Sequence, residues 1–119
     1  KHTITDSEYS IMKILWNSGE KMTVSEVVKA LDGNDWTPST VSTFLQRLLK
    51  KNVVSCEKKG NTNLYYPILK QNDYDMRETE NFLSKIYKGS VKNLVAALYE
   101  NKKLSKEDMS ELKSMFDLE

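Results

Sequence analysis

A chain of 119 residues can form one compact domain, or a small domain with an appendage, but not two large domains. With 18 basic and 17 acidic side chains its formal net charge is only +1, so any attraction for a polyanion has to come from local segregation of charge. One Cys and one His cannot build a structural zinc site or a disulfide framework, and no segment has the apolar length of a membrane span.

The first helix is expected over residues 6–17. Thr5 and Glu8 have the spacing of a capping box, in which a hydroxyl and a carboxylate satisfy the free backbone N–H groups at a helix N-terminus. Ile11, Met12 and Leu15 follow at helical spacing and indicate the side that faces the core.

A second, shorter helix is expected over residues 24–31. Thr23 and Glu26 repeat the capping-box spacing ahead of apolar residues at 27, 28 and 31. The sequence DGND at 32–35 is rich in turn-forming residues, so it predicts a turn before the next element.

The third helix is expected to begin at Pro38 and to reach Lys50. Thr37 is a favourable N-cap, and proline suits the first helical position because its missing N–H is not needed there. Apolar residues at 41, 44, 45, 48 and 49 form the stripe of a core-facing helix. Trp36 either packs on Val41 as a hydrophobic staple or directs its indole N–H to a phosphate.

The opposite face of this third helix has no acidic residue. Hydroxyl and amide groups with positive charge suit a helix in the major groove of DNA, where short side chains allow a close approach to the bases. An ordinary solvated face is the alternative. The face consists of Ser39, Ser42, Thr43, Gln46, Arg47 and Lys50, with Thr40 beside it.

A hairpin is expected over residues 53–68, where β-branched and aromatic residues flank a short loop at 60–62. Lys58, Lys59, Asn61 and Thr62 lie at its tip, as in a wing that reaches a DNA backbone. Residues 36–63 hold five basic side chains and one acidic, which gives this segment a net charge of +4. This local excess favours DNA binding over a merely solvated face.

Three further helices are expected after residue 70, within fewer than fifty residues. That length is too short to bury their apolar stripes in an isolated unit, so we expect them to form a dimerisation arm. Folding back onto the first seventy residues is the alternative. The expected dimer contacts are Phe82, Leu83, Ile86, Tyr87, Val91, Leu94, Val95, Leu98, Leu112 and Phe116.

The expected fold is therefore mainly α with a small β-hairpin wing. Residues 1–70 form a winged helix-turn-helix DNA-binding domain and residues 71–119 a helical dimerisation domain. Catalysis is not expected, because Cys56 has no internal His as its base and is better explained as a small hydrophobe in a strand. We expect a cytoplasmic protein that needs no metal or cofactor and does not bind membranes directly.

Four stretches carry a resemblance to a known family: TDSEYSIMKILW, NDWTPSTVSTFLQRLLKKNVV, NLYYPI and NFLSKIYKGSVKNLVAALYEN. The chain resembles the penicillinase repressor family (BlaI/MecI type) over nearly its full length. The resemblance implies a homodimeric winged-helix repressor on palindromic operator DNA, controlling β-lactam resistance genes. It places Thr40, Ser42, Thr43 and Arg47 at DNA-facing positions.

The resemblance also implies how the repressor is removed. In this family a membrane-bound sensor metalloprotease responds to a β-lactam, and the repressor is cut in its dimerisation helices, typically at an Asn-Phe bond. By alignment the bond falls at Ala97-Leu98, so this sequence departs from the pattern. Either its protease recognises a different pair or it is induced in another way.

Two other functions stay open from the residues alone. One is a winged-helix regulator of other genes that senses a small molecule directly. The other is a winged helix used as a protein-interaction module, in which the basic wing would meet an acidic partner. A salt series of DNA binding separates these alternatives, because phosphate contacts weaken steeply with salt.

Overall fold

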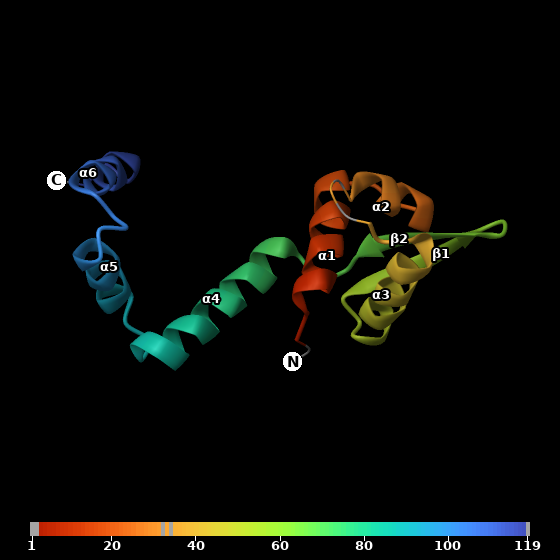
Figure 1. Cartoon of the computed structure of the whole chain (residues 1–119), viewed down its shortest axis with the longest axis horizontal. Coiled ribbons are helices and arrows are strands. Elements are labelled where there is room, and N and C mark those ends of the chain that lie inside the picture. Colours follow the sequence, from red (N-terminus) through yellow and green to blue (C-terminus); the bar gives the residue numbers. More distant parts are fainter. Residues whose placement is uncertain (1–2, 32, 34, 119) are drawn as a thin grey trace. The chain divides into compact units, whose positions relative to one another are not determined.

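The computed structural model describes residues 3–31, 33 and 35–118, and within them it has six helices and one two-stranded sheet (Figure 1). The predicted fold class, mainly helical with one hairpin, is confirmed. The expected turn at 32–35 lies partly outside the described residues. In chain order the elements are α1 (Asp6–Ser18), α2 (Val24–Ala30), α3 (Pro38–Lys50), β1 (Val54–Lys59), β2 (Thr62–Pro67), α4 (Gln71–Tyr87), α5 (Val91–Glu100) and α6 (Lys106–Met115).

The first two helices begin with the capping boxes that their sequences predict. In α1 the Thr5 hydroxyl accepts a hydrogen bond from the Glu8 N–H (3.2 Å), and the Glu8 carboxylate accepts one from the Thr5 N–H (3.0 Å). Thr23 and Glu26 make the same pair of bonds in α2. Each box satisfies two N–H groups that would otherwise lack a partner.

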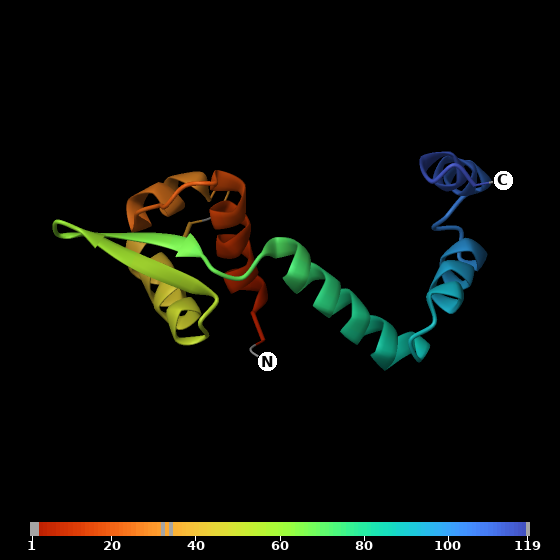
Figure 2. The same ribbon diagram turned by 180° about the vertical axis from the view of Figure 1, so that it is seen from behind.

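The hairpin pairs β1 with β2 in antiparallel register, from Val54 opposite Pro67 to Lys59 opposite Thr62. Gly60, in the left-handed region at φ +64°, reverses the chain between them. Met22 and Tyr65 exchange backbone hydrogen bonds of 2.9 and 2.7 Å, which ties the segment before α2 to β2. From behind, the two strands run past the helices and project beyond them (Figure 2).

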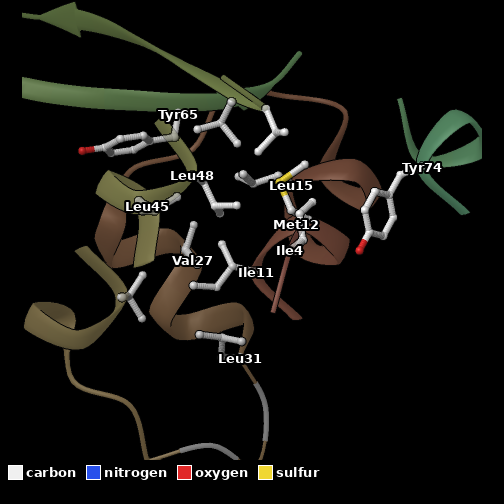
Figure 3. Packing of buried hydrophobic residues seen from close by; sticks show 13 residues of the cluster. Ile4, Ile11, Met12, Leu15, Val27, Leu31, Leu45, Leu48, Tyr65 and Tyr74 are labelled. Carbon is white, nitrogen blue, oxygen red and sulfur yellow. The ribbon is translucent and has the colours of Figure 1, made fainter. Parts of the chain in front are cut away.

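The chain divides into two compact units, Lys1–Tyr74 and Asp75–Glu119. In unit 1, side chains from α1, α2 and α3 converge beneath the hairpin, and Ile11, Val27 and Leu48 are completely buried (Figure 3). The buried hydrophobic cluster consists of Ile4, Ile11, Met12, Leu15, Val27, Leu31, Val41, Leu45, Leu48, Val53, Val54, Tyr65 and Tyr74.

Unit 1 extends past residue 70, where the sequence placed a domain boundary. Tyr74, in the first turn of α4, is only 5% exposed, and its ring lies 5.8 Å from Tyr9 and 6.4 Å from Trp16. The Trp16 indole N–H donates to the Leu69 carbonyl at 2.8 Å. These contacts make the start of α4 part of the first unit.

None of the helices in the described ranges combines the length and hydropathy of a membrane-spanning segment.

Glu8 is the buried charged residue of the core region, with an exposed fraction of 1%. Burial raises the pKa of its carboxyl group, but the hydrogen bonds from Lys51 (2.5 Å) and from the Thr5 N–H, with the charge of Lys51, lower this pKa below its ordinary value. Lys51 also donates to the Thr3 carbonyl at 2.7 Å. The pair therefore fastens the end of α3 to the start of α1.

Glu8→Gln should lower the free energy of unfolding by about 1–3 kcal/mol at neutral pH, because a charged hydrogen bond to Lys51 is lost. A carboxylate with a depressed pKa stabilises the fold fully above its ordinary value of 4.5, and this contribution is lost as the pH falls through the folded-state value. The difference between wild type and variant should therefore shrink in acid. Denaturant unfolding at several pH values measures it.

Glu26→Gln is the matched control, since Glu26 occupies the same capping position in α2 but is exposed. It should lose less stability at neutral pH than Glu8→Gln. Equal losses in both variants would mean that the bond between Glu8 and Lys51 contributes nothing beyond capping.

Candidate nucleic-acid interface

The orientation of α3 is fixed by its apolar stripe. Val41, Leu45 and Leu48 are completely buried, and Phe44 and Leu49 are half-buried against the same core. The other side of the helix therefore faces solvent. It carries the seven α3 residues that were predicted to meet DNA: Ser39, Thr43, Gln46, Arg47 and Lys50 are exposed, and Thr40 and Ser42 are half-buried.

The N-terminus of α3 lacks the carboxylate that caps α1 and α2. Thr37 accepts from the Thr40 N–H at 3.2 Å, so the hydroxyl cap is present. Thr40, however, stands where α1 has Glu8 and α2 has Glu26. The partial positive charge at this helix end is thus not neutralised by an acidic residue of its own first turn, which favours a nearby anion.

Two hydroxyl protons on this face are used inside the helix. The Thr43 hydroxyl donates to the Ser39 carbonyl at 3.1 Å, and the Thr37 hydroxyl donates to the Thr40 hydroxyl oxygen at 3.2 Å. With its proton committed, Thr43 offers a ligand its oxygen as an acceptor and its methyl group. A cytosine amino group or a thymine methyl would match these groups.

Trp36 lies next to α3 and packs its ring on Phe44. Their ring centroids are 5.1 Å apart at 49°, so Trp36 reaches two turns into the helix, farther than the predicted contact with Val41. The guanidinium carbon of Arg47 lies 5.7 Å from the Phe44 centroid. Trp36, Phe44 and Arg47 thus form a continuous row of ring and cation contacts.

The wing carries its positive charge at the tip, where Lys58, Lys59 and Asn61 are all exposed. Its one acidic residue, Glu57, forms an ion pair with Lys21, and the hydrogen bond from Lys21 lowers the pKa of Glu57. Lys21 comes from outside the 36–63 segment and also lies 4.8 Å from the centroid of the Tyr66 ring.

Ion pairs engage Lys51 and Glu57, so the remaining charges of residues 36–63 are all positive and lie on α3 and the wing. Lys51 is directed to Glu8, and the Glu57 carboxylate is matched by Lys21. Four cations of this segment stay exposed, and no acidic residue within the segment is left to oppose them. They are Arg47, Lys50, Lys58 and Lys59.

A polar hollow of about 350 Å³ lies between the start of α2, the middle of α3 and the hairpin. It brings Ser42, Gln46 and Asn61 of the predicted set together, and the Gln46 amide donates to the Tyr65 hydroxyl at 3.3 Å. Trp36, Ser39 and Lys50 do not line it. Thr62, at the predicted tip of the hairpin, also lines it, and the lining residues that were not predicted as site residues are Thr23, Val24, Ser25, Asn63 and Tyr65.

Thr23 and Ser25 were missed because their sequence context explains them as the start of a helix, and Asn63 because the register of the hairpin is not visible in one sequence. Their common signal is a small polar side chain next to a predicted element end.

Cys56 lies half-buried on β1 opposite Tyr65 and packs against the core. Across the described ranges, no three His, Cys, Asp or Glu side chains gather as a metal site requires.

Unit 2 has apolar side chains on its surface. Among residues 75–118 none is buried, and Ile86, Val91 and Phe116 are 57%, 58% and 63% exposed. Ala97 is half-buried and Leu98 is exposed in α5. Of the ten residues predicted to form a dimer, Phe82, Ile86, Val91, Leu98, Leu112 and Phe116 are exposed, and Leu83, Tyr87, Leu94 and Val95 are half-buried.

Known proteins are similar to this chain in sequence, and one solved structure is similar to part of it in fold. A penicillinase repressor from Bacillus licheniformis is 34% identical over 110 residues, which cover 92% of this chain and 85% of the relative. The methicillin resistance regulatory protein MecI of Mammaliicoccus sciuri is 27% identical over 116 residues, covering 98% and 94%.

Among solved structures, the solution structure of the Bacillus licheniformis BlaI monomeric form in complex with the blaP half-operator aligns with a TM-score of 0.52 and 34% identity. The match covers 61% of this chain and 89% of that one. The sequence pattern of the Penicillinase repressor family itself matches residues 4–117. The resemblance found in the sequence is confirmed, and the chain belongs to the penicillinase repressor family.

Proposed function

We propose that this chain is a sequence-specific DNA-binding transcriptional repressor that acts as a homodimer on a palindromic operator. The observation that carries the proposal is the outward face of α3, which has hydroxyl, amide and cationic groups and no carboxylate. Membership of the family and the half-operator complex of its BlaI relative support the proposal. Members of this family are regulators rather than enzymes, so no catalytic site is proposed.

On this proposal α3 enters the major groove. Ser39, Ser42, Thr43 and Gln46 are short or flexible enough to meet base edges, and Arg47 can hold a guanine or a phosphate. The N-terminus of α3, free of acidic residues in its first turn, is suited to a backbone phosphate. Base edges would then supply sequence preference, while phosphate contacts set the register on the duplex.

The wing would contact the DNA backbone beside the groove. Its tip presents Lys58, Lys59 and Asn61 on a hairpin that β1 and β2 hold in fixed register. Lysine contributes a point charge to phosphate rather than a pattern that distinguishes bases. We therefore assign affinity to the wing and sequence preference to α3.

Dimerisation would occur through unit 2. Its helices leave large apolar side chains exposed, more than is usual for a unit without a partner, so a second copy of the chain would cover them. Joining two units of modest affinity makes the second half-site contact an intramolecular event at high effective concentration. Separation of the two copies would thus release the operator without any change in α3.

Inactivation is proposed to occur by proteolysis at Ala97-Leu98, by a membrane-bound sensor metalloprotease, with β-lactam resistance genes under control. The Ala97 carbonyl accepts two hydrogen bonds from Asn101, one from its backbone N–H (3.1 Å) and one from its side-chain amide (2.7 Å). A protease that binds an extended substrate would first have to unwind this end of α5.

Arg47→Ala and Lys59→Ala should each weaken binding to all duplex sequences if the side chain holds a phosphate; if Arg47 holds a guanine instead, Arg47→Ala should also alter base preference. On a plot of log affinity against log salt, each should lower the slope of the wild type by about 0.9. Lys13→Ala, which removes an exposed lysine of α1, is the control and should leave the slope unchanged. Affinity that does not depend on salt would contradict the DNA interface and favour an interaction module.

Ile86→Asp should convert the dimer to a monomer at micromolar concentration, because it places a charge on an apolar surface that a second copy would cover. The variant should bind a palindromic duplex much more weakly and a single half-site unchanged. Sedimentation and binding titrations measure both. Ser84→Asp adds the same charge at an exposed polar position of α4 and should stay dimeric; two monomeric variants, or two dimeric ones, would count against this surface.

A further inference from the structure

One ring of α3 touches two side chains that were predicted to contact DNA. The Phe44 ring centroid lies 5.1 Å from that of Trp36 and 5.7 Å from the guanidinium carbon of Arg47. Trp36 precedes the helix, and Arg47 lies three residues after Phe44, in the last turn of the helix. Phe44 therefore connects the two ends of the proposed DNA-reading face.

The Phe44 ring is less exposed than the Arg47 side chain that it touches. It is half-buried against the core, next to Leu45, which is completely buried. Arg47 is exposed, and a free arginine side chain loses considerable rotamer entropy when it is fixed against a ligand. A cation held over a ring has already lost part of that freedom, so less remains to be lost on binding.

The orientation of the Trp36 indole also involves the Phe44 ring. The Trp36 indole N–H donates to no acceptor among the described residues, and this is the group that was predicted to reach a phosphate. Trp36 lies outside the helix, and its ring is held by packing against the core and by the tilted contact with Phe44. Aromatic pairs of this kind stabilise one orientation of the ring.

We propose that Phe44 is a positioning residue for DNA binding: without touching DNA, it holds the Trp36 indole and the Arg47 guanidinium in the orientation in which they meet it. This inference rests on the proposed function and adds a residue to it. Core packing alone would need only apolar volume at position 44, and leucine serves that purpose at position 49 on the same stripe. A positioning role needs a ring.

A double-mutant cycle separates the two roles. The probe is a palindromic duplex enriched from a random pool by the wild-type chain, and affinities are compared among wild type, Phe44→Leu, Arg47→Ala and the double variant. Phe44→Leu should bind on the order of 3- to 10-fold more weakly, as expected from the loss of a ring pair and a cation–π contact. Phe44→Tyr keeps the ring and should bind nearly as well as wild type.

The decisive result is the coupling between the substitutions. Once Phe44 is leucine, Arg47→Ala should cost less affinity than it does in the wild type, because Arg47 has lost its support. Lys50→Ala is the control on the same helix. Lys50→Ala should lower the DNA affinity by the same factor in wild type and in Phe44→Leu, since no ring contact links Lys50 to Phe44 among the described residues.

Thermal unfolding checks that each variant is folded at the temperature of the binding assay. If Phe44→Leu is not folded there, Phe44→Met is used in its place. Two results would overturn the inference while leaving DNA binding intact. One is that Phe44→Leu binds DNA as tightly as wild type. The other is that Arg47→Ala lowers the affinity by the same factor whether position 44 is phenylalanine or leucine. A wild-type chain that enriches no sequence and ignores salt would instead refute the proposed function.

Discussion

The burial of one side of α3 is the constraint on which the rest of the interface depends. Val41, Leu45 and Leu48 can reach the core formed by α1 and α2 in only one rotation of the helix. That rotation leaves Ser39, Thr43, Gln46, Arg47 and Lys50 exposed, where an acidic residue would repel phosphate. The choice of Thr40 in place of a capping glutamate is consistent with the same requirement, because hydrogen bonding at the helix start is kept while the negative charge is absent.

The net charge of the chain is only +1, yet four exposed cations lie within residues 36–63, and the other charges of this segment are engaged in ion pairs. Lys51 is used inside unit 1 to neutralise the buried Glu8, where an unpaired carboxylate would be costly. Lys21 covers the one carboxylate of the wing. The cations that remain exposed between residues 36 and 63 are thereby gathered on α3 and the wing, which is the distribution that attracts a polyanion at a defined place.

Much of this arrangement could be predicted from the sequence, because short-range rules determine it. The capping boxes, the stripe at 41, 44, 45, 48 and 49 and the loop at Gly60 gave the helices and hairpin within a residue or two of their ends. Contacts between residues distant in the sequence could not be predicted in this way. The pairing of Glu8 with Lys51 and the bridge from Met22 to Tyr65 depend on how the elements pack, and single-sequence periodicity carries no signal for that. The contact of Phe44 with Arg47, in contrast, has the i,i+3 spacing of neighbours on one helix.

In the proposed account the two units have different roles. Unit 1 binds DNA, and unit 2 forms the dimer that strengthens the binding. The most direct test of the central claim is backbone amide shift mapping of the full isotope-labelled chain, titrated with a single half-site duplex. The account predicts that shifts concentrate at residues 36–50 and 58–63, with the α1 core positions unchanged. Shifts confined to residues 75–118, or spread evenly over unit 1, would contradict it.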